Sequence, residues 1–177
     1  IPASDVPEQI STAGDEASGT GNMKFMMNGA LTIGTRDGAT IEMAEAAGEE
    51  NLFLFGLSAE EVADSRGWYN PQWHYENEPE TRRALDLIFS DHFSRHEPGA
   101  FNPIREALLT HGDYYMHLAD LKSYSETQER LGRLYADSQG WANKAILNVA
   151  GSGKFSSDRT IAEYARDIWR VTPCPVS

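Results

Sequence analysis

Two short apolar runs separated by a helical segment place the strongest constraint on how this chain folds. Residues 31–35 have the composition of a β-strand and are followed by the turn-forming pair Asp37-Gly38. Residues 39–47 carry apolar side chains near helical spacing, with a glycine placed to end the helix. Residues 52–55 are apolar without interruption, which is typical of a strand buried on both faces of a parallel sheet. Strand, helix and strand joined by short links predict an α/β fold with an open sheet.

The number of strands indicates a piece of a larger unit. Two strands do not make a stable sheet, and the sequence opens on Ile1 rather than on methionine. We therefore expect residues 1–57 to be the last portion of a larger sheet domain. We also expect the chain to be a fragment of a longer protein.

Residues 58–177 are predicted to form a mostly helical region that packs on this sheet. Ser58 and Glu61 have the spacing of a capping box, which marks the start of the first helix. Caps and apolar spacing predict further helices that begin near Pro79, Asn102, Ser123, Trp141 and Ser157. The last three helices are expected to turn apolar side chains inward, among them Tyr135, Ile146, Val149, Ile161 and Ile168.

The composition excludes several classes of partner. Of 177 residues, 15 are basic and 27 acidic, a net charge of −12, so nucleic acid and acidic membranes are expected to be repelled. No run reaches the roughly 18 apolar residues that cross a bilayer, and the N-terminus lacks the layout of a signal peptide. The single cysteine, Cys174, excludes a disulfide within the chain and a metal site made of cysteines. We expect a protein of a reducing compartment with no metal site.

The segment with the most chemical information comes early in the chain. Gly19 and Gly21 flank Thr20 just before residues 22–28, which can form a helix. Glycines let backbone N–H groups turn toward a ligand, and the first turn of a helix offers unpaired N–H groups to an anion such as phosphate. Lys24 follows Thr20 by one helical turn, and helical side chains lean back toward the N-terminus. The lysine amine and the anion site are therefore predicted to face the same space.

Pyridoxal 5′-phosphate fits that spacing. This compound carries a phosphate at one end and, at the other, an aldehyde that forms a Schiff base with a lysine amine. Lys24 is one of four lysines and is surrounded in sequence by apolar Met23, Phe25, Met26 and Met27, so that burial would favour the neutral amine. The residues alone leave open a plain loop-to-helix junction with a solvated lysine.

A longer stretch resembles a known family. Residues 16–35 read Glu-Ala-Ser-Gly-Thr-Gly-Asn-Met-Lys-Phe-Met-Met-Asn-Gly-Ala-Leu-Thr-Ile-Gly-Thr and closely resemble the pyridoxal-phosphate segment of the glycogen (α-glucan) phosphorylases. The resemblance continues through Asp37-Gly38 and residues 42–45 and 48–51, and it returns at residues 152–161. It thus spans almost the whole chain. Asp15 and Thr40 depart from the family pattern, but neither falls on a position with a catalytic role.

The resemblance implies a glycosyltransferase that cleaves α-1,4-glucan with inorganic phosphate and releases glucose 1-phosphate. By the same resemblance, Lys24 would form the Schiff base with pyridoxal phosphate, and Thr20 and Gly21 would hold its 5′-phosphate through backbone N–H groups. Glucosyl hydroxyls would be hydrogen-bonded by Glu16, Ser18 and Gly19. The cofactor would work through its phosphate, which ionises near neutrality and exchanges a proton with the substrate phosphate.

The family's architecture implies that much of the enzyme lies outside this chain. Its members have two Rossmann-like domains of the GT-B type, with the active site in the cleft between them. Residues 1–57 would be the end of the cofactor-binding domain, and residues 58–177 a helical region packed on it. The N-terminal part and the basic residues that bind substrate phosphate would be missing, so the chain alone is expected to be inactive. A cytoplasmic location and a homodimer are also implied.

Two alternatives from other classes stay open. The chain could be a non-catalytic glucan-binding or interaction module derived from a phosphorylase, or a helical scaffold without a ligand.

Three further patterns are interpreted as structural. The run 151–154, Gly-Ser-Gly-Lys, resembles a P-loop but is followed by Phe155 and preceded by a helix, so we predict a turn between helices. The pair His92 and His96 has metal-ligand spacing but no third ligand, which favours a solvated helix end. An aromatic group is expected to pack within the helical region rather than to stack on sugar: Trp68, Tyr69, Trp73 and Tyr75.

Overall fold

A small parallel sheet forms the centre of the structure, a computed structural model that describes residues 3–16, 18–172 and 174. Its three strands lie in the order β1-β2-β3 and span Glu8–Gln9, Ile33–Thr35 and Phe53–Phe55. Ile33 pairs with Glu8 on one side and with Phe53 on the other. The two predicted strands are confirmed, each at the end of its apolar run. The first strand was missed, because a Glu-Gln pair has no apolar pattern to mark it.

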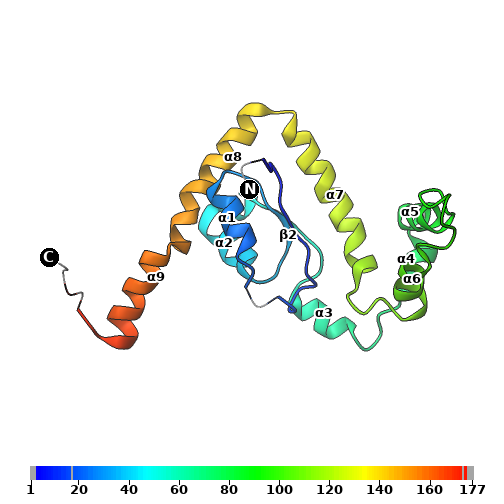
Figure 1. Cartoon of the computed structure of the whole chain (residues 1–177), viewed down its shortest axis with the longest axis horizontal. Helices are drawn as coiled ribbons and strands as arrows, with labels where there is room; N and C mark the ends of the chain where they lie inside the picture. The colour runs from blue at the N-terminus through cyan, green and yellow to red at the C-terminus, as the bar shows by residue number, and fades with distance from the viewer. Residues whose placement is uncertain (1–2, 17, 173, 175–177) are drawn as a thin grey trace.

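Helices cover both faces of this sheet. On one face lie α1 (Gly21–Met27) and α2 (Ala39–Ala47), whose Met26, Met43 and Ala44 pack with Leu52. On the other face, α7 (His117–Tyr135) places Leu131 against the side chains of β2 and β3. In Figure 1, α7 and α8 (Ser138–Gly151) form the two arms of an inverted V that encloses the sheet, α1 and α2. The predicted α/β arrangement of strand, helix and strand is confirmed.

The outer edge of β3 is closed by side chains of α7. The Gly56 N–H donates to Ser123 Oγ at 2.9 Å, and Arg130 Nη2 donates to the Leu54 carbonyl at 3.3 Å. Side chains of this kind protect an edge strand from pairing with another chain. Among the described residues, β1 pairs only with β2, so the opposite edge of the sheet has no strand beside it.

The remaining helices extend away from the sheet on both sides (Figure 1). The capping box predicted from Ser58 and Glu61 is confirmed, with both of its hydrogen bonds present. The α-helices of this region are α3 (Ala59–Ser65), α4 (Pro71–Asn77), α5 (Pro79–Phe89), α6 (Asn102–Arg105) and α9 (Ser157–Glu163). The short 3₁₀ turns are η1 (Glu49–Asn51) and η3 (Ser152–Phe155), and the π turns are η2 (Glu106–Thr110) and η4 (Tyr164–Trp169).

The helix predicted to begin at Ser123 begins earlier. Helix α7 starts at His117, and Ser123 lies within it. The Ser123 hydroxyl donates to the Asp120 carbonyl at 3.0 Å and accepts from Gly56, so it bonds within its own helix and to β3 rather than capping a terminus. A serine and a glutamate three residues later therefore form a capping box only when the serine is the N-cap residue, at the point where the helix begins.

The apolar faces predicted for the last helices are confirmed only in part: Leu134, Trp141 and Ala145 pack against the core, but other side chains are exposed. Tyr135 and Ile146 are 60% and 65% exposed, although Leu131 on α7 is buried as expected. Other side chains expected to face inward are also exposed: Val149, Ile161 and Ile168. The inward orientation expected for these five residues is therefore wrong for the described part of the chain, although their helical spacing is as predicted. Within the described part of the chain, no helix combines the length and apolar character needed to cross a membrane.

The central strand gives a stability prediction. Ile33 is fully buried between the two helical layers, so Ile33→Ala should lower the free energy of unfolding by about 2–5 kcal/mol, as deletion of buried methyl groups does. Ile146→Ala is the matched control, because the same truncation at an exposed site changes stability by only about 0.5 kcal/mol or less. Urea unfolding followed by circular dichroism measures both. Equal effects of the two substitutions would contradict the core described here.

Candidate functional site

The predicted ligand segment lies at the carboxyl edge of the sheet. It follows β1, while Asp37 follows β2 and Gly56 follows β3, so the ends of all three parallel strands meet on this side. Open α/β sheets bind their ligands outside the carboxyl ends of the strands. The helix predicted for residues 22–28 is confirmed as α1, displaced by one residue.

Backbone geometry at the start of α1 leaves room for an anion. Thr20 occupies the N-cap position but makes no hydrogen bond from its side chain to the first turn. Gly19 has a φ of +74°, a left-handed conformation that favours glycine. At Gly21 an added Cβ would meet no atom of the described residues within 4 Å, so these residues leave the space beside this backbone open. N–H groups of the first turn can therefore reach a ligand here.

Lys24 lies on the exposed side of α1. The expectation that it is buried among methionines is wrong: Met26 is 0% exposed, but Met27 is 63% exposed and Lys24 itself is exposed. Lys24 and Met26 are two positions apart, or about 200° around a helix, so the burial of one puts the other outside. Among the described residues, no carboxylate lies within ion-pair distance of the Lys24 amine. The amine is thus accessible to a ligand, and the open backbone of α1 fits a phosphate-bearing aldehyde.

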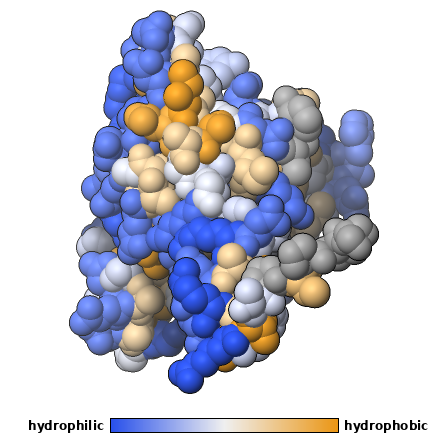
Figure 2. All heavy atoms as spheres, turned by 90° about the vertical axis from the view of Figure 1, so that its left-hand side faces the viewer, coloured by the Kyte–Doolittle hydropathy of each residue, from blue (hydrophilic) through white to orange (hydrophobic). Residues whose placement is uncertain are grey.

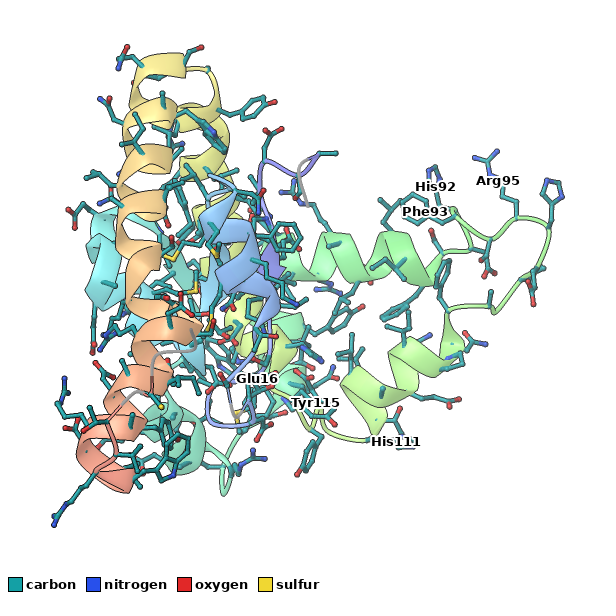
Figure 3. The ribbon with its side chains drawn as sticks, turned by 60° about the vertical axis from the view of Figure 1, so that its left-hand side comes forward. Glu16, His92, Phe93, Arg95, His111 and Tyr115 are labelled. Atoms are coloured by element: carbon teal, nitrogen blue, oxygen red, sulfur yellow. The ribbon has the colours of Figure 1, made fainter. Side chains whose placement is uncertain are left out.

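Glu16 and Ser18 lie in the loop between β1 and α1. Glu16 is partly buried, and its Oε1 accepts from the Ser18 N–H at 3.4 Å. In Figure 3, Glu16 lies below the sheet on the same side as Tyr115. The loop contacts that region directly, since Thr12 Oγ1 donates to the Tyr115 carbonyl at 2.8 Å. The six residues predicted to bind cofactor and sugar thus fall on one loop and the helix that follows it.

A second polar cluster at this edge was missed by the sequence interpretation. Tyr69 donates to Asp113 Oδ2 at 2.7 Å, and burial together with this bond raises the pKa of the phenol. Asp120 accepts from the Leu57 N–H at 2.8 Å and lies against Gly56, where an added Cβ would come within 2.8 Å of its carboxylate. The Asp120 contacts tie the end of β3 to α7, and the Tyr69 bond ties the segment after α3 to the turn that precedes α7. No spacing in the sequence links these residues, which lie up to 64 positions apart.

The patterns interpreted as structural are found as follows. Residues 151–154 form the junction of α8 and η3, which confirms a turn between helices. His92 and His96 are exposed beyond the end of α5, and Figure 3 shows His92 far from Glu16. The aromatic group does not pack as one unit. Tyr69 and Tyr75 bond to Asp113 and Asp86, whereas both tryptophans are exposed: Trp68 and Trp73.

The sheet and the loop that follows its first strand define the structural class of this protein. A parallel sheet with helices on both faces, and a glycine-containing loop that leads from a strand end into a helix, place the described residues in the α/β class, whose open sheets bind ligands outside the carboxyl ends of their strands.

Comparison with known proteins gives the family. The family model described as carbohydrate phosphorylase matches residues 1–171. The brain form of glycogen phosphorylase from Mus musculus is 56% identical over 175 residues, which cover 98% of this chain and 20% of that protein. The muscle forms from Bos taurus and Oryctolagus cuniculus are each 55% identical with the same coverage. This chain belongs to the carbohydrate phosphorylase family. It spans about a fifth of the length of the curated relatives that it matches.

The Asp120 environment gives a pH prediction. Burial raises the pKa of its carboxyl above the usual 3.8, with smaller raising contributions from Asp113 and Glu61; the Leu57 N–H and His117 act in the opposite direction. When folding raises the pKa of a carboxyl, the folded state binds the proton more tightly than the unfolded state does. This contribution to stability is fully present at a pH below the pKa of the unfolded state, and it is lost as the pH rises through the pKa of the folded state.

Asp120→Asn should therefore gain stability relative to the unsubstituted chain as the pH rises from below 3.8 to neutrality. The asparagine cannot ionise, and its Oδ1 can still accept from the Leu57 N–H. Urea unfolding across this pH range measures the difference, and Asp64→Asn at an exposed position is the control. A difference that does not change with pH would contradict this assignment.

Proposed function

We propose that this chain is the part of a glycogen or α-glucan phosphorylase that holds pyridoxal phosphate and part of the sugar site. The enzyme would be a glycosyltransferase that cleaves α-1,4-glucan with inorganic phosphate and releases glucose 1-phosphate. The observation that carries the proposal is the match over residues 1–171 together with about 55% identity to proteins named glycogen phosphorylase. The open loop-to-helix geometry around Gly19, Gly21 and Lys24 agrees with it.

Each site residue then has a role that its position allows. Lys24 would hold the cofactor covalently through its amine, which is exposed on α1. Thr20 and Gly21 would bind the 5′-phosphate with their backbone N–H groups, because the first turn of α1 has no side-chain cap. The remaining three residues, on the preceding loop, would bind glucosyl hydroxyls: Glu16, Ser18 and Gly19.

The chemistry proposed for this chain is mainly binding and orientation. When bound, pyridoxal phosphate supplies a phosphate group that ionises near neutrality and can exchange a proton with the substrate phosphate. A loop that joins the sugar-binding residues directly to α1 would set the glucosyl unit beside that phosphate. Fixed orientation of this kind removes much of the entropic barrier to a reaction between two bound groups.

Two uncovered surfaces support the proposal that the rest of a longer enzyme packs here. One edge of β1 has no strand beside it within the described residues. On α8 and α9, large apolar side chains are exposed. Figure 2 views the molecule from the side on which these two helices lie in Figure 1, and it shows hydrophobic groups gathered on that face. Apolar patches of this kind mark interaction surfaces. We propose that residues 1–57 end a Rossmann-like domain of the GT-B type and that residues 58–177 form its helical extension. A cytoplasmic homodimer, as is common in this family, completes the proposal.

The 177-residue chain alone should release no glucose 1-phosphate from glycogen and phosphate, because the other side of the cleft would be absent. Addition of the remaining part of a phosphorylase should restore phosphorolysis, measured as glucose 1-phosphate. The alternative of a non-catalytic glucan-binding or interaction module predicts glucan binding without restored activity. Turnover by the isolated chain would contradict the proposal of a divided site.

The cofactor assignment can be tested by chemical labelling. In a chimera whose residues 1–171 replace the matching part of the rabbit muscle enzyme, pyridoxal phosphate and borohydride should label Lys24 in stoichiometric amount. Lys24→Ala should abolish the label and the cofactor absorbance, because Lys24 is the only lysine on α1, the helix that begins directly after the open loop. Lys144→Ala is the matched control on α8. A label on Lys122, Lys144 or Lys154 in place of Lys24 would overturn the assignment.

A further inference from the structure

We infer that Asp37 is a positioning residue that holds the sugar-binding loop in place and acts on the substrate through Glu16 and Ser18. This inference rests on the proposed function, which gives those two residues their contact with the glucosyl unit. Asp37 itself lies just beyond β2, and it was noted in the sequence only as half of a turn-forming pair.

One buried carboxylate fixes the first half of the loop. The Gly14 N–H donates to Asp37 Oδ1 at 3.0 Å, and the Glu16 N–H donates to Oδ2 at 2.8 Å. Ser11 Oγ donates to the same Oδ2 at 3.3 Å. Asp37 is only 6% exposed, and bonds from N–H groups to an ionised carboxylate are stronger than those to a neutral acceptor. The backbone on both sides of residue 15 is thereby held by a single side chain.

The two residues after Asp37 fix the second half of the loop. The Ala39 N–H donates to the Ser18 carbonyl at 2.6 Å. This approach depends on Gly38, where φ is +50° and an added Cβ would lie 2.5 Å from the Ser18 carbonyl oxygen. Three successive residues at the end of β2 therefore contact the backbone of Gly14, Glu16 and Ser18. The pair Asp37-Gly38 is needed for these contacts and not merely for a turn.

The position of Asp37 is itself set by the sheet. Its N–H donates to the Thr35 carbonyl at 2.9 Å, and its carbonyl accepts from the Thr40 N–H at 3.2 Å. Thr35 is the last residue of β2, and its Oγ1 donates to the Ser11 carbonyl at 2.7 Å. Asp37 thus connects a rigid central strand to the loop that carries the predicted sugar contacts. Sites held by rigid elements in this way keep the orientation that reaction requires.

Helix α1 is anchored by other contacts. Met26 is fully buried against α2, and Asn22 Nδ2 donates to Thr40 Oγ1 at 3.1 Å. A change confined to the Asp37 carboxylate should therefore move the sugar-binding residues more than the cofactor-binding ones. This difference separates a positioning role from a general contribution to folding.

The test uses the full-length chimera described above with Asp37→Asn. Asparagine keeps the shape of the side chain but has one acceptor oxygen in place of two and sets an NH₂ group against a backbone donor. We expect kcat/KM for glycogen, per bound cofactor, to fall about ten- to a hundred-fold, because a small misplacement of a reacting group has an effect of this size. Cofactor content should stay unchanged, and hydrogen exchange in the peptide that contains Gly14 and Glu16 should become faster.

Two further variants complete the design. Gly38→Ala should reproduce the loss by pushing Ser18 away, which provides a second measurement if Asp37→Asn does not fold. Asp64→Asn, at an exposed position on α3, should leave every measurement unchanged.

Unchanged kcat/KM in both Asp37→Asn and Gly38→Ala would overturn the inference, as would a loss of cofactor as large as the loss of activity. If the unsubstituted chimera neither binds cofactor nor releases glucose 1-phosphate, the proposed function has failed instead. Hydrogen exchange then still decides whether Asp37 holds the loop, since that measurement requires no turnover.

Discussion

The pairing of β2 with a parallel neighbour on each side is the interaction on which the rest of the structure depends. All three residues of this strand are buried, and its two faces receive different helical layers. Because the strands are parallel, their carboxyl ends meet at one edge, and residues distant in sequence become neighbours there. The loop after β1, the turn after β2 and the end of β3 are therefore parts of one surface.

Backbone N–H groups are divided between two uses at that edge. Those of Gly14 and Glu16 are bonded within the protein to the Asp37 carboxylate. The first turn of α1, by contrast, has no side-chain cap from Thr20. A chain with a net charge of −12 has few ways to attract an anion through its overall field. Under the proposed function, local backbone donors and one lysine would supply the attraction that the net charge does not.

The sequence was most informative where a local pattern decides the structure. The runs at residues 31–35 and 52–55, the helix at 39–47 and the cap at Ser58 all depend on neighbours in the chain, and all are confirmed. Features that depend on distant partners were not predictable in the same way. The strand at Glu8–Gln9 is defined only by its pairing with β2. Ser123 lies within α7, which begins at His117, and its hydroxyl accepts from the distant Gly56 N–H.

The candidate site shows the same division. The loop and helix that carry Thr20, Gly21 and Lys24 were predicted from spacing and are confirmed as structure. The supporting role of Asp37 was not predicted, because its contacts reach back 21 to 26 positions. The expected burial of Lys24 failed for a related reason. Neighbouring methionines in sequence do not share a helical face, so local composition gave no measure of exposure.

The exposed apolar side chains of α8 and α9, such as Ile146, would contribute differently to the stability of this chain and to its assembly with a partner surface. With solvent around it, Ile146 adds little to the stability of the chain on its own. Against a complementary surface, the same side chain would be desolvated and would contribute to assembly. Sequence variation at such positions would then follow the needs of the interface rather than those of this fold. Under the proposed function, a substitution harmless to the isolated chain would then still weaken assembly of the longer enzyme.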